Sequence, residues 1–570
     1  MASHRKLDAP RGATIQYTIT FLLAGLCLTT AAAQTGASET QIEQLFQQER
    51  WQEIAQTAPP LGVSAQVDLE YGIALARLGK WDNAEAALQD GLRLSPKDVR
   101  FPVELAGVAF KQGHFASAQS WLQQAIRITP RDEYSIDFLA TVFYLQGNLD
   151  AALKYWNRIG KPRIESVRLL PKPQVRPVLL DRAFAFSPAS TLRLVDLKTT
   201  EARIGEMDLF SSYRIDLQAR TDGNFDAVFN NSERNGCGAN KWTCLLAIFG
   251  QSPAQTVNFD YFNIAREAIN FHSSLRWDAE KRRVTALVEA PVVSTPKWHA
   301  GVGIDLRNEN WGIVSSFSGP AQLLGALNLK REAVAAQFTD VVSGRWQWSA
   351  EMEVSDRQYH NILTGDVLNR QLLTSGAQLK QSFSMNSQLL SWPERRLTLG
   401  GQVSVSAARL WSAPGRDFAK LQGSAILHWL PQHSGEKYEI QERVRAGKTF
   451  GDSPFDELYT LGVLGDTDLK MKAHIATRDG KKGSAPLGRN YFLSNWEATR
   501  NFSPLSLATI KVGPFVDTGK VTDPVAMFGS HKWLWDAGLE AKVQVMGFSV
   551  VFSYGRDLRS GRNAFVISTP

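Results

Sequence analysis

The sequence predicts a multi-domain chain with three parts: an all-α solenoid of short repeats, a small α/β module, and a transmembrane antiparallel β-barrel of about 16 strands. Three observations lead to this order. Residue types recur every 34 positions between residues 40 and 160. A stretch rich in Pro, Arg and Lys over 161–177 then reads as a linker. From about residue 245 to residue 570, runs of 8–11 residues alternate between apolar and polar side chains.

The first 33 residues have the three-part pattern of a secretory signal peptide. Arg5, Lys6 and Arg11 form a positive start, residues 17–28 are apolar, and the alanines at 31–33 form a small-residue cleavage site. A short N-terminal membrane anchor is the alternative, but the apolar run is too short to span a bilayer. The mature chain is therefore expected to be exported.

The repeat is clearest at Gly79, Gly113 and Gly147, which are spaced by 34 residues each time. Four further columns share this interval: Pro96 and Pro130; Ala84, Ala118 and Ala152; Gly72, Ala106 and Ala140; and Trp81, Phe115 and Leu149. The period resembles the tetratricopeptide repeat, with glycine in the turn and small residues where two helices touch. About three repeats are expected over 40–160. Their concave surface would bind peptides or protein partners, and a rigid spacer without a ligand is the alternative.

A small α/β module is expected over residues 178–232. The pattern predicts strand, helix, strand and strand over residues 178–186, 189–209, 213–219 and 224–229. Thr221, Asp222 and Gly223 form the turn between the last two strands.

The barrel is expected over residues 245–570. Over residues 538–545, apolar side chains point one way, whereas Glu540, Lys542 and Gln544 point the other way. A soluble sandwich would bury those polar groups without water, but a membrane barrel places them in a wet lumen. The chain also has 16 Trp, 29 Phe and 12 Tyr, which suits the aromatic belts of such a barrel.

Several other classes of protein are disfavoured. Cys237 and Cys244 flank a polar turn and are expected to form a disulfide, and with so few cysteines a metal site is not expected. The net charge of +7 is spread over the chain without a basic run, which argues against nucleic-acid binding. Because no nucleophile elbow, metal cluster or phosphate loop precedes the barrel, neither an enzyme nor a cofactor is expected.

Three segments of the C-terminal third resemble the outer-membrane assembly and translocation superfamily that includes BamA, TamA and FhaC. Residues 454–480 are similar to the long sixth extracellular loop of that family. Residues 495–500 are similar to its Asn-x-Glu strand. Phe515, Asp517 and Gly519 match its Phe-x-Asp-x-Gly strand. The resemblance covers residues 178–570, and it makes the module at 178–232 a divergent POTRA domain.

The resemblance implies that the loop folds back into the lumen, where a cation pairs with carboxylates on the two strands. Mapped onto this chain, the cation is Lys470 and the carboxylates are Glu497 and Asp517. Such a lock is charge-assisted, and removing one partner would leave an unpaired charge. The alternatives are a solvated loop lysine and an aspartate at a turn end.

The loop motif departs from the family pattern. Gly465 and Leu469 fit, but lysine stands where the family has arginine, and Met471 and Lys472 replace its glycine and aromatic residue. A lysine offers a point charge without the guanidinium fork, so the lock is expected to be looser. Arg478, beside Asp479, is a rival for the cation.

The resemblance implies a protein that assembles or translocates polypeptides at the outer membrane, with its N-terminal domains in the periplasm. Its expected partners are outer-membrane lipids and a polypeptide substrate or periplasmic protein. An exopolysaccharide-export porin with a repeat scaffold is the alternative, and a passive structural barrel is a third reading.

Overall fold

The computed structural model describes residues 39–568 except for 238–243, 246–247, 249–254, 315–322, 365–371, 413–414, 464–468, 506–507, 523–531 and 546–547. The expected signal peptide therefore lies outside the described residues, as does Gly465. The chain divides into two compact units, residues 1–145 and 146–570. We call them the helical unit and the barrel unit. Among the described residues, no helix is long and apolar enough to cross a membrane.

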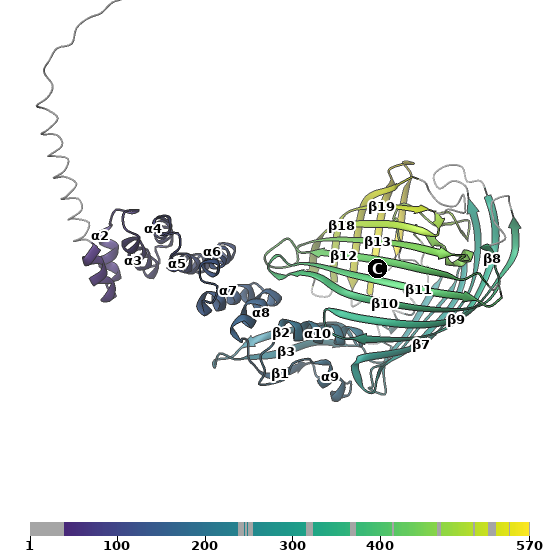
Figure 1. Cartoon of the computed structure of the whole chain (residues 1–570), viewed down its shortest axis with the longest axis horizontal. Coiled ribbons are helices and arrows are strands. Elements are labelled where there is room, and N and C mark those ends of the chain that lie inside the picture. Colours follow the sequence, from purple (N-terminus) through teal and green to yellow (C-terminus); the bar gives the residue numbers. More distant parts are fainter. Residues whose placement is uncertain are drawn as a thin grey trace, which may run out of the picture. The chain divides into compact units, whose positions relative to one another are not determined.

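The helical unit consists of paired helices whose spacing follows the repeat (Figure 1). Its labelled helices are α2 (Trp51–Thr57), α3 (Ala65–Arg77), α4 (Trp81–Leu94), α5 (Arg100–Lys111), α6 (Phe115–Ile128) and α7 (Glu133–Leu145). Gly79 and Gly113 lie in the turns between helices with φ of 74° and 77°, a left-handed conformation that glycine adopts without strain. Leu88, Phe101 and Leu105 are buried where the helices pack.

Gly91 has no room for a side chain where α4 packs on Phe101. A Cβ at Gly91 would lie 2.3 Å from Phe101 Cε1, and this ring is fully buried. We expect Gly91→Ala to lower the free energy of unfolding of the helical unit by about 1–3 kcal/mol through overpacking. A Cβ at Gly107 would meet nothing within 4 Å, so Gly107→Ala should instead be neutral or stabilising. Far-UV circular dichroism of the full chain during heating measures both, and equal shifts would contradict the packing argument.

The barrel unit begins with α8 (Leu149–Trp156) and a small α/β module. The module contains β1 (Ile164–Leu170), α9 (Pro177–Ala183), α10 (Leu194–Glu206), β2 (Phe210–Ala219) and β3 (Phe225–Glu233). The sheet order is β1-β3-β2, with β1 parallel and β2 antiparallel to β3. Phe229 on the central strand is fully buried, and Phe184 and Phe210 pack edge-on against its ring.

Two expectations about this module were wrong. The expected linker at 161–177 contains β1, and the expected strand at 178–186 is largely the helix α9. Proline is favoured in the first turn of a helix, and Pro177 starts α9. The leucines at 179 and 180 and Ala183 are buried at helical spacing. Prolines around β1 hid the strand, whose hydrogen bonds depend on β3, about 60 residues later in the sequence.

The barrel wall is a closed ring of strands (Figure 1). Its first ten strands are β4 (Thr256–Ile264), β5 (Ile269–Trp277), β6 (Lys281–Val292), β7 (Thr295–Val314), β8 (Leu323–Val341), β9 (Trp346–Thr364), β10 (Gly376–Trp392), β11 (Leu397–Leu410), β12 (Phe418–Trp429) and β13 (Tyr438–Gly451). Five more follow a long loop: β18 (Asn490–Leu505), β19 (Ala508–Thr522), β20 (Leu534–Val545), β21 (Phe548–Asp557) and β22 (Asn563–Ser568). The described residues thus hold fifteen such strands, in line with the expected number of about 16, and the closed sheet also includes the two-residue strands β15 (Thr477–Arg478) and β16 (Lys481–Lys482).

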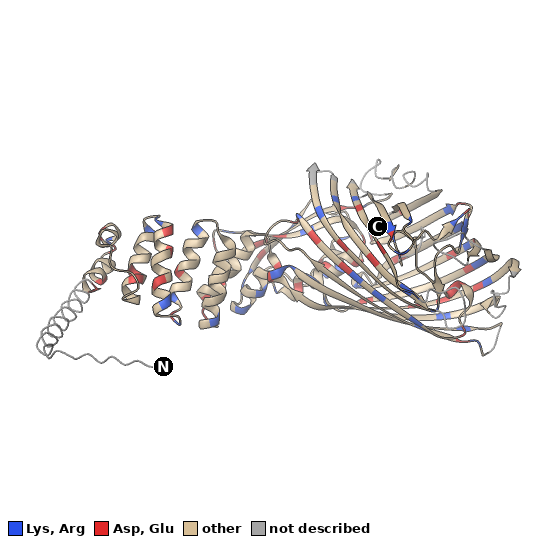
Figure 2. Ribbon diagram, turned by 90° about the horizontal axis from the view of Figure 1, so that it is seen from above, with Lys and Arg blue, Asp and Glu red and all other residues tan. Residues whose placement is uncertain are grey.

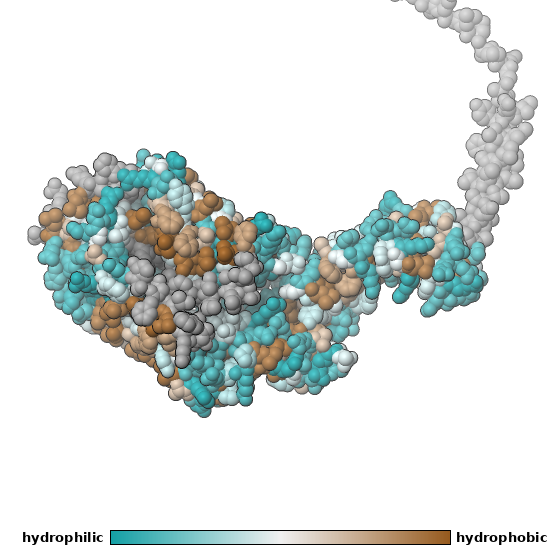
Figure 3. All heavy atoms as spheres, turned by 180° about the vertical axis from the view of Figure 1, so that it is seen from behind, coloured by the Kyte–Doolittle hydropathy of each residue, from teal (hydrophilic) through white to brown (hydrophobic). Residues whose placement is uncertain are grey.

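The two faces of the wall differ as the alternation predicts. On β7, Val302, Ile304 and Leu306 are exposed on the outer face. On β8 and β9, Arg331 and Arg357 are buried on the inner face. Figure 2 shows charged residues along the barrel strands, and Figure 3 shows hydrophobic side chains gathered in patches on the visible surface of the barrel. An apolar exterior with a charged interior is the arrangement of a transmembrane barrel.

Candidate functional site: a loop held in the barrel lumen

The described residues of the loop over 452–489, namely 452–463 and 469–489, lie inside the barrel, and we call this loop the lumen loop. It contains short strands, β14 (Tyr459–Thr460), β15 (Thr477–Arg478), β16 (Lys481–Lys482) and β17 (Leu487–Gly488), and the single-turn helix η5 (Phe455–Glu457). Its partners on the wall are inner-face residues. On β19, Asp517 pairs with the loop while its neighbour Val516 is exposed on the outer face. On β20, Asp536 is fully buried while Trp535 is exposed.

Lys472 lies near the middle of the lumen loop and is the cation of a first anchor. Its Nζ lies 2.7 Å from Glu497 Oε1, 3.3 Å from Glu540 Oε2 and 3.6 Å from Asp517 Oδ1. The same nitrogen lies 4.3 Å from the centre of the Phe515 ring, a cation–π contact. Burial opposes the charge of this ammonium group, but the three carboxylates outweigh burial and raise the pKa of Lys472 above its usual range. Lys472 therefore stays charged.

The expected cation, Lys470, was wrong by two residues. The backbone N–H of Lys472 donates to Asp517 Oδ2 at 2.9 Å, and this bond places residue 472 beside the carboxylates. The carbonyl of Lys470 instead accepts a hydrogen bond from Asn495 Nδ2 at 3.0 Å. Between them, the side chain of Met471 is fully buried. The expected register counted from Leu469 by the family pattern, whereas these backbone hydrogen bonds set the actual one.

Glu497 and Asp517 stand where the resemblance places them, and Asn495 connects them to the loop. Asn495 Nδ2 donates to Asp517 Oδ1 at 2.7 Å, and Asn495 Oδ1 accepts from Arg445 at 2.8 Å. Glu497 also pairs with Lys542 on β20. We call Lys472 and these carboxylates, with Glu540, the basic-end anchor.

The other two residues of the Phe-x-Asp-x-Gly motif have packing reasons. The ring of Phe515 is buried against Gly538 and Gly555, where an added Cβ would lie 2.8 and 3.0 Å from its carbons. A Cβ at Gly519 would lie 3.2 Å from the sulfur of Met471. Gly519, which has no side chain, therefore lets Met471 of the loop approach the wall closely, and Gly538 and Gly555 leave room for the Phe515 ring.

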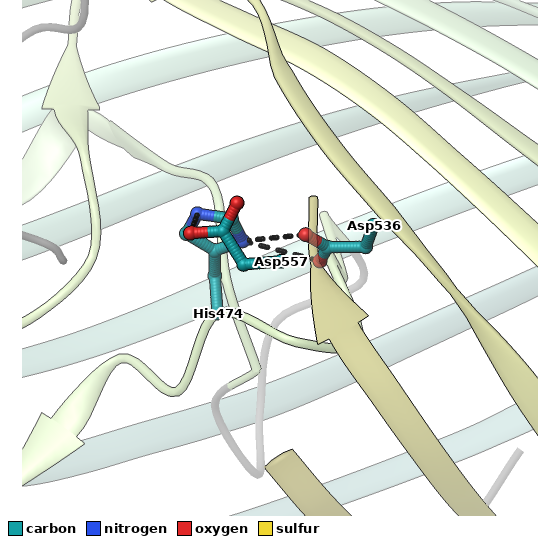
Figure 4. Close-up of side chains that lie close together, drawn as sticks. All are labelled: His474, Asp536 and Asp557. Atoms are coloured by element: carbon teal, nitrogen blue, oxygen red, sulfur yellow. Dashed lines mark hydrogen bonds and ion pairs between the residues drawn. The ribbon is translucent and has the colours of Figure 1, made fainter. Parts of the chain in front are cut away.

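His474 extends this anchor to β20 and β21 (Figure 4). Its Nδ1 lies 3.0 Å from Asp536 Oδ1, and its Nε2 lies 3.7 Å from Asp557 Oδ2. Ala473 N–H donates to Asp536 Oδ2 at 2.8 Å. Burial opposes the charge of the imidazole, but the aspartates outweigh burial and raise the pKa of His474. A metal ion would take one imidazole nitrogen, yet each nitrogen faces its own carboxylate, so the geometry fits an ion-paired imidazolium better.

The start of the lumen loop carries the opposite charge. Asp456 and Glu457 in η5 are buried. Arg357 Nε lies 3.1 Å from Asp456 Oδ1, and Lys420 Nζ lies 2.7 Å from Glu457 Oε2. Arg331 pairs with both carboxylates at 3.5 Å. We call this group, with Lys380 at 3.5 Å from Glu457, the acidic-end anchor.

Sequence reasoning missed the acidic-end anchor. Residues 454–459 were matched only as part of the loop motif, and the wall cations lie on β8, β9, β10 and β12. Burial opposes the charge of Glu457, but Lys380, Lys420 and Arg331 outweigh burial and hold its pKa well below the usual range. The only available signal was the polar face of those strands, which does not reveal a partner so far along the chain.

The remaining sequence-predicted residues lie elsewhere. Leu469 is buried in the apolar cluster beside the basic-end anchor. Arg478 and Asp479 form the β15–β16 hairpin, where Asp479 has φ of 50°, and Arg478 is not the cation of the anchor. Cys237 and Cys244 are joined by a disulfide with Cα atoms 5.1 Å apart. The repeat glycine Gly147 lies at the start of the barrel unit with φ of 76°.

The small module and α8 bind to one rim of the barrel, which carries short turns between strands. Asn148 Nδ2 donates to the carbonyl of Pro393, and Lys154 Nζ lies 2.7 Å from Glu394 in the β10–β11 turn. On α10, Thr199 accepts from Gly344 N–H at 3.0 Å in the β8–β9 turn. We call this rim the module rim.

The chain is similar to several solved structures and to one sequence family. A BamA structure from Haemophilus ducreyi lacking POTRA domains 1–3 is 13% identical, with 72% of this chain and 83% of that chain covered and a TM-score of 0.39. CdiB from Escherichia coli is 13% identical, with 72% and 75% covered and a TM-score of 0.46. MamA is 22% identical over 17% of this chain and 57% of that chain, with a TM-score of 0.17. No curated protein sequence matches the chain. Residues 75–140 match the tetratricopeptide repeat family, so the helical unit contains repeats of that family.

Proposed function

We propose that the protein translocates or assembles polypeptides at the outer membrane, with the helical repeats and the small module in the periplasm. The observation that carries this proposal is the lumen loop, anchored by opposite charges near its start and near its middle inside a closed barrel. Ion pairs can exchange partners, so the loop is a removable plug rather than a permanent filling of the lumen.

The small module supports a polypeptide cargo. In the order β1-β3-β2, strand β2 pairs on one side only within the module. An exposed strand edge can bind an extended peptide by main-chain hydrogen bonds, whatever the peptide sequence. The repeats of the helical unit are of a kind that presents a concave surface for protein ligands. The peptide would then pass from the module, which contacts the module rim, into the lumen.

The test compares a deletion strain of the native host with strains that express the wild type or variants. We expect the deletion to remove one or more polypeptides from the outer membrane or the medium, as measured by quantitative proteomics, and to leave extracellular polysaccharide unchanged. Unchanged polypeptides with lost polysaccharide would overturn the proposal in favour of an exopolysaccharide-export porin.

A photo-reactive amino acid identifies the cargo directly. Placed at Ser553, a buried β21 position on the same face as Asp557, it should cross-link to a polypeptide during export. The matched control is Tyr554, which is exposed on the outer face of the same strand and should not cross-link to that polypeptide. Equal cross-linking at both positions would contradict passage through the lumen.

A further inference from the structure

Five cations on the module rim each lie over an aromatic ring. The pairs are Lys297 with Trp298, Arg345 with Trp346, Arg395 with Trp392, Lys437 with Tyr438, and Arg500 with Phe502. The distances from cation to ring centre run from 4.3 Å for Arg395 to 5.9 Å for Arg345. We call these ten residues the rim belt. They come from the ends of β7, β9, β10, β13 and β18 or from the adjoining turns, so consecutive hairpins on this rim contribute to the rim belt.

The rings of the rim belt face away from the lumen. Trp298 lies on the same face of β7 as Val302 and Ile304, and all three are exposed. Trp346 similarly shares the outer face of β9 with Met352. The rings are 38% to 44% exposed, although tryptophan, tyrosine and phenylalanine are usually buried more fully. An outward aromatic ring at a strand end is suited to the boundary between acyl chains and headgroups.

The cations of the rim belt have few anionic partners within the protein. Arg345, Arg395, Lys437 and Arg500 form no ion pair with the residues that the structure describes, and Lys297 lies 3.9 Å from Asp340. Elsewhere on the outer surface, the exposed Lys330 does form an ion pair: its Nζ lies 2.7 Å from Glu332 Oε1. Four of the five cations of the rim belt therefore have no ion pair among the described residues and lie beside rings at the edge of the apolar surface.

The opposite rim provides a comparison on the same strand. β13 begins at Tyr438 on the module rim and ends near Phe450, where Lys448 lies 5.0 Å from the ring centre. Among the cation–ring pairs of the described residues, this is the one outward pair on that rim. The cation–ring pairs are thus concentrated on the side where the small module binds, whereas exposed rings such as Trp277, Trp411 and Trp535 also lie at strand ends on the opposite rim.

We propose that the rim belt binds the phosphate headgroups of anionic phospholipids, such as phosphatidylglycerol, in the membrane leaflet on the module side. The chemistry is complementary at two depths. The ring lies against the upper acyl chain, and the cation, whose stem reaches past the ring, pairs with the phosphate. A basic residue near an anionic leaflet is attracted to it, and this attraction acts over about a Debye length. The inference rests on the membrane placement in the proposed function.

The test uses the full chain reconstituted in phosphatidylcholine vesicles with or without phosphatidylglycerol. Native mass spectrometry counts the phospholipids that stay bound after extraction. We expect wild type to retain phosphatidylglycerol in preference to phosphatidylcholine, and the triple variant R395Q/K437Q/R500Q to lose about fivefold of that preference per cation. The matched control, K448Q, removes an outward cation at the other end of β13 and should keep the preference.

Three outcomes would overturn the inference: a triple variant with the wild-type preference, a K448Q variant with the same loss as the triple variant, or displacement of the lipid by inorganic phosphate alone. The four residues substituted in these variants, Arg395, Lys437, Arg500 and Lys448, are all exposed, so the variants should fold. Insertion into vesicles without a preference for phosphatidylglycerol contradicts the lipid site alone. Failure of the wild type to insert into either vesicle contradicts the membrane placement, and with it the proposed function.

Discussion

Replacing Lys472 by methionine is expected to break the basic-end anchor of the lumen loop and to lower barrel stability by about 3–5 kcal/mol. Methionine keeps most of the length of the side chain but removes the ammonium group. Glu497, Glu540 and Asp517 would then lose the cation that they share, in a site where the lysine side chain is 11% exposed. Lys542 would still pair with Glu497 and Glu540, but Asp517 would lose the cation of this anchor. The burial of that carboxylate makes the loss large, because an exposed ion pair contributes at most about 1 kcal/mol. The measurement is the temperature at which the barrel loses its compact form on a semi-native gel.

Two variants separate the charge of Lys472 from its position. K470M makes the same substitution two residues earlier, where the contact to Asn495 is through the backbone carbonyl. It should change the transition less than K472M does. K472R keeps the charge, and its planar donors can still reach the carboxylates, so it should recover much of the stability. A K470M variant as unstable as K472M would show that the loop register described above is wrong.

The carboxylate side of this anchor could be predicted from sequence, but its cation could not. Asp517 and Glu497 lie in strands, where a period of two fixes which residues face the lumen. Lys472 lies in a loop, where no period applies and the register depends on hydrogen bonds from its backbone to Asp517. A motif matched by spacing therefore placed the strands correctly and the loop tip two residues away.

Long-range pairing explains the other differences. The acidic residues of η5 meet cations on β8, β9 and β12, and Arg331 is separated from Glu457 by 126 residues. In the small module, β1 is a strand because β3 pairs with it, although its own flanking prolines indicate a linker. In both cases the local sequence permits several structures, and a distant segment selects one. The repeat and the strand alternation, which recur many times, could be predicted directly, as could the disulfide between Cys237 and Cys244, which are seven residues apart.

Neutralising Glu457 is expected to break the acidic-end anchor of the lumen loop. In E457Q, Lys420, Lys380 and Arg331 would face one charged residue fewer, and the cost should again be about 3–5 kcal/mol because the site is buried. The matched control is E332Q on β8, whose partner Lys330 is exposed, and it should cost less than about 1 kcal/mol. The semi-native gel again reports the change in stability.

Both anchors are expected to oppose opening of the lumen. The loop is also held by the buried pair of Lys482 Nζ with Glu309 Oε1 at 3.1 Å, which K472M and E457Q leave intact. The free energies of the two separate anchors should add, so the open population should rise by the product of the two single effects. K472M and E457Q alone should thus give a small conductance in planar bilayers, and the double variant a much larger one. If E457Q alone conducted as much as the double variant, the acidic end would hold the loop by itself. If neither single variant nor the double variant conducted, and adding K482M to break the pair with Glu309 changed nothing, the loop would not be the barrier in the lumen, and a removable plug could no longer support export through it.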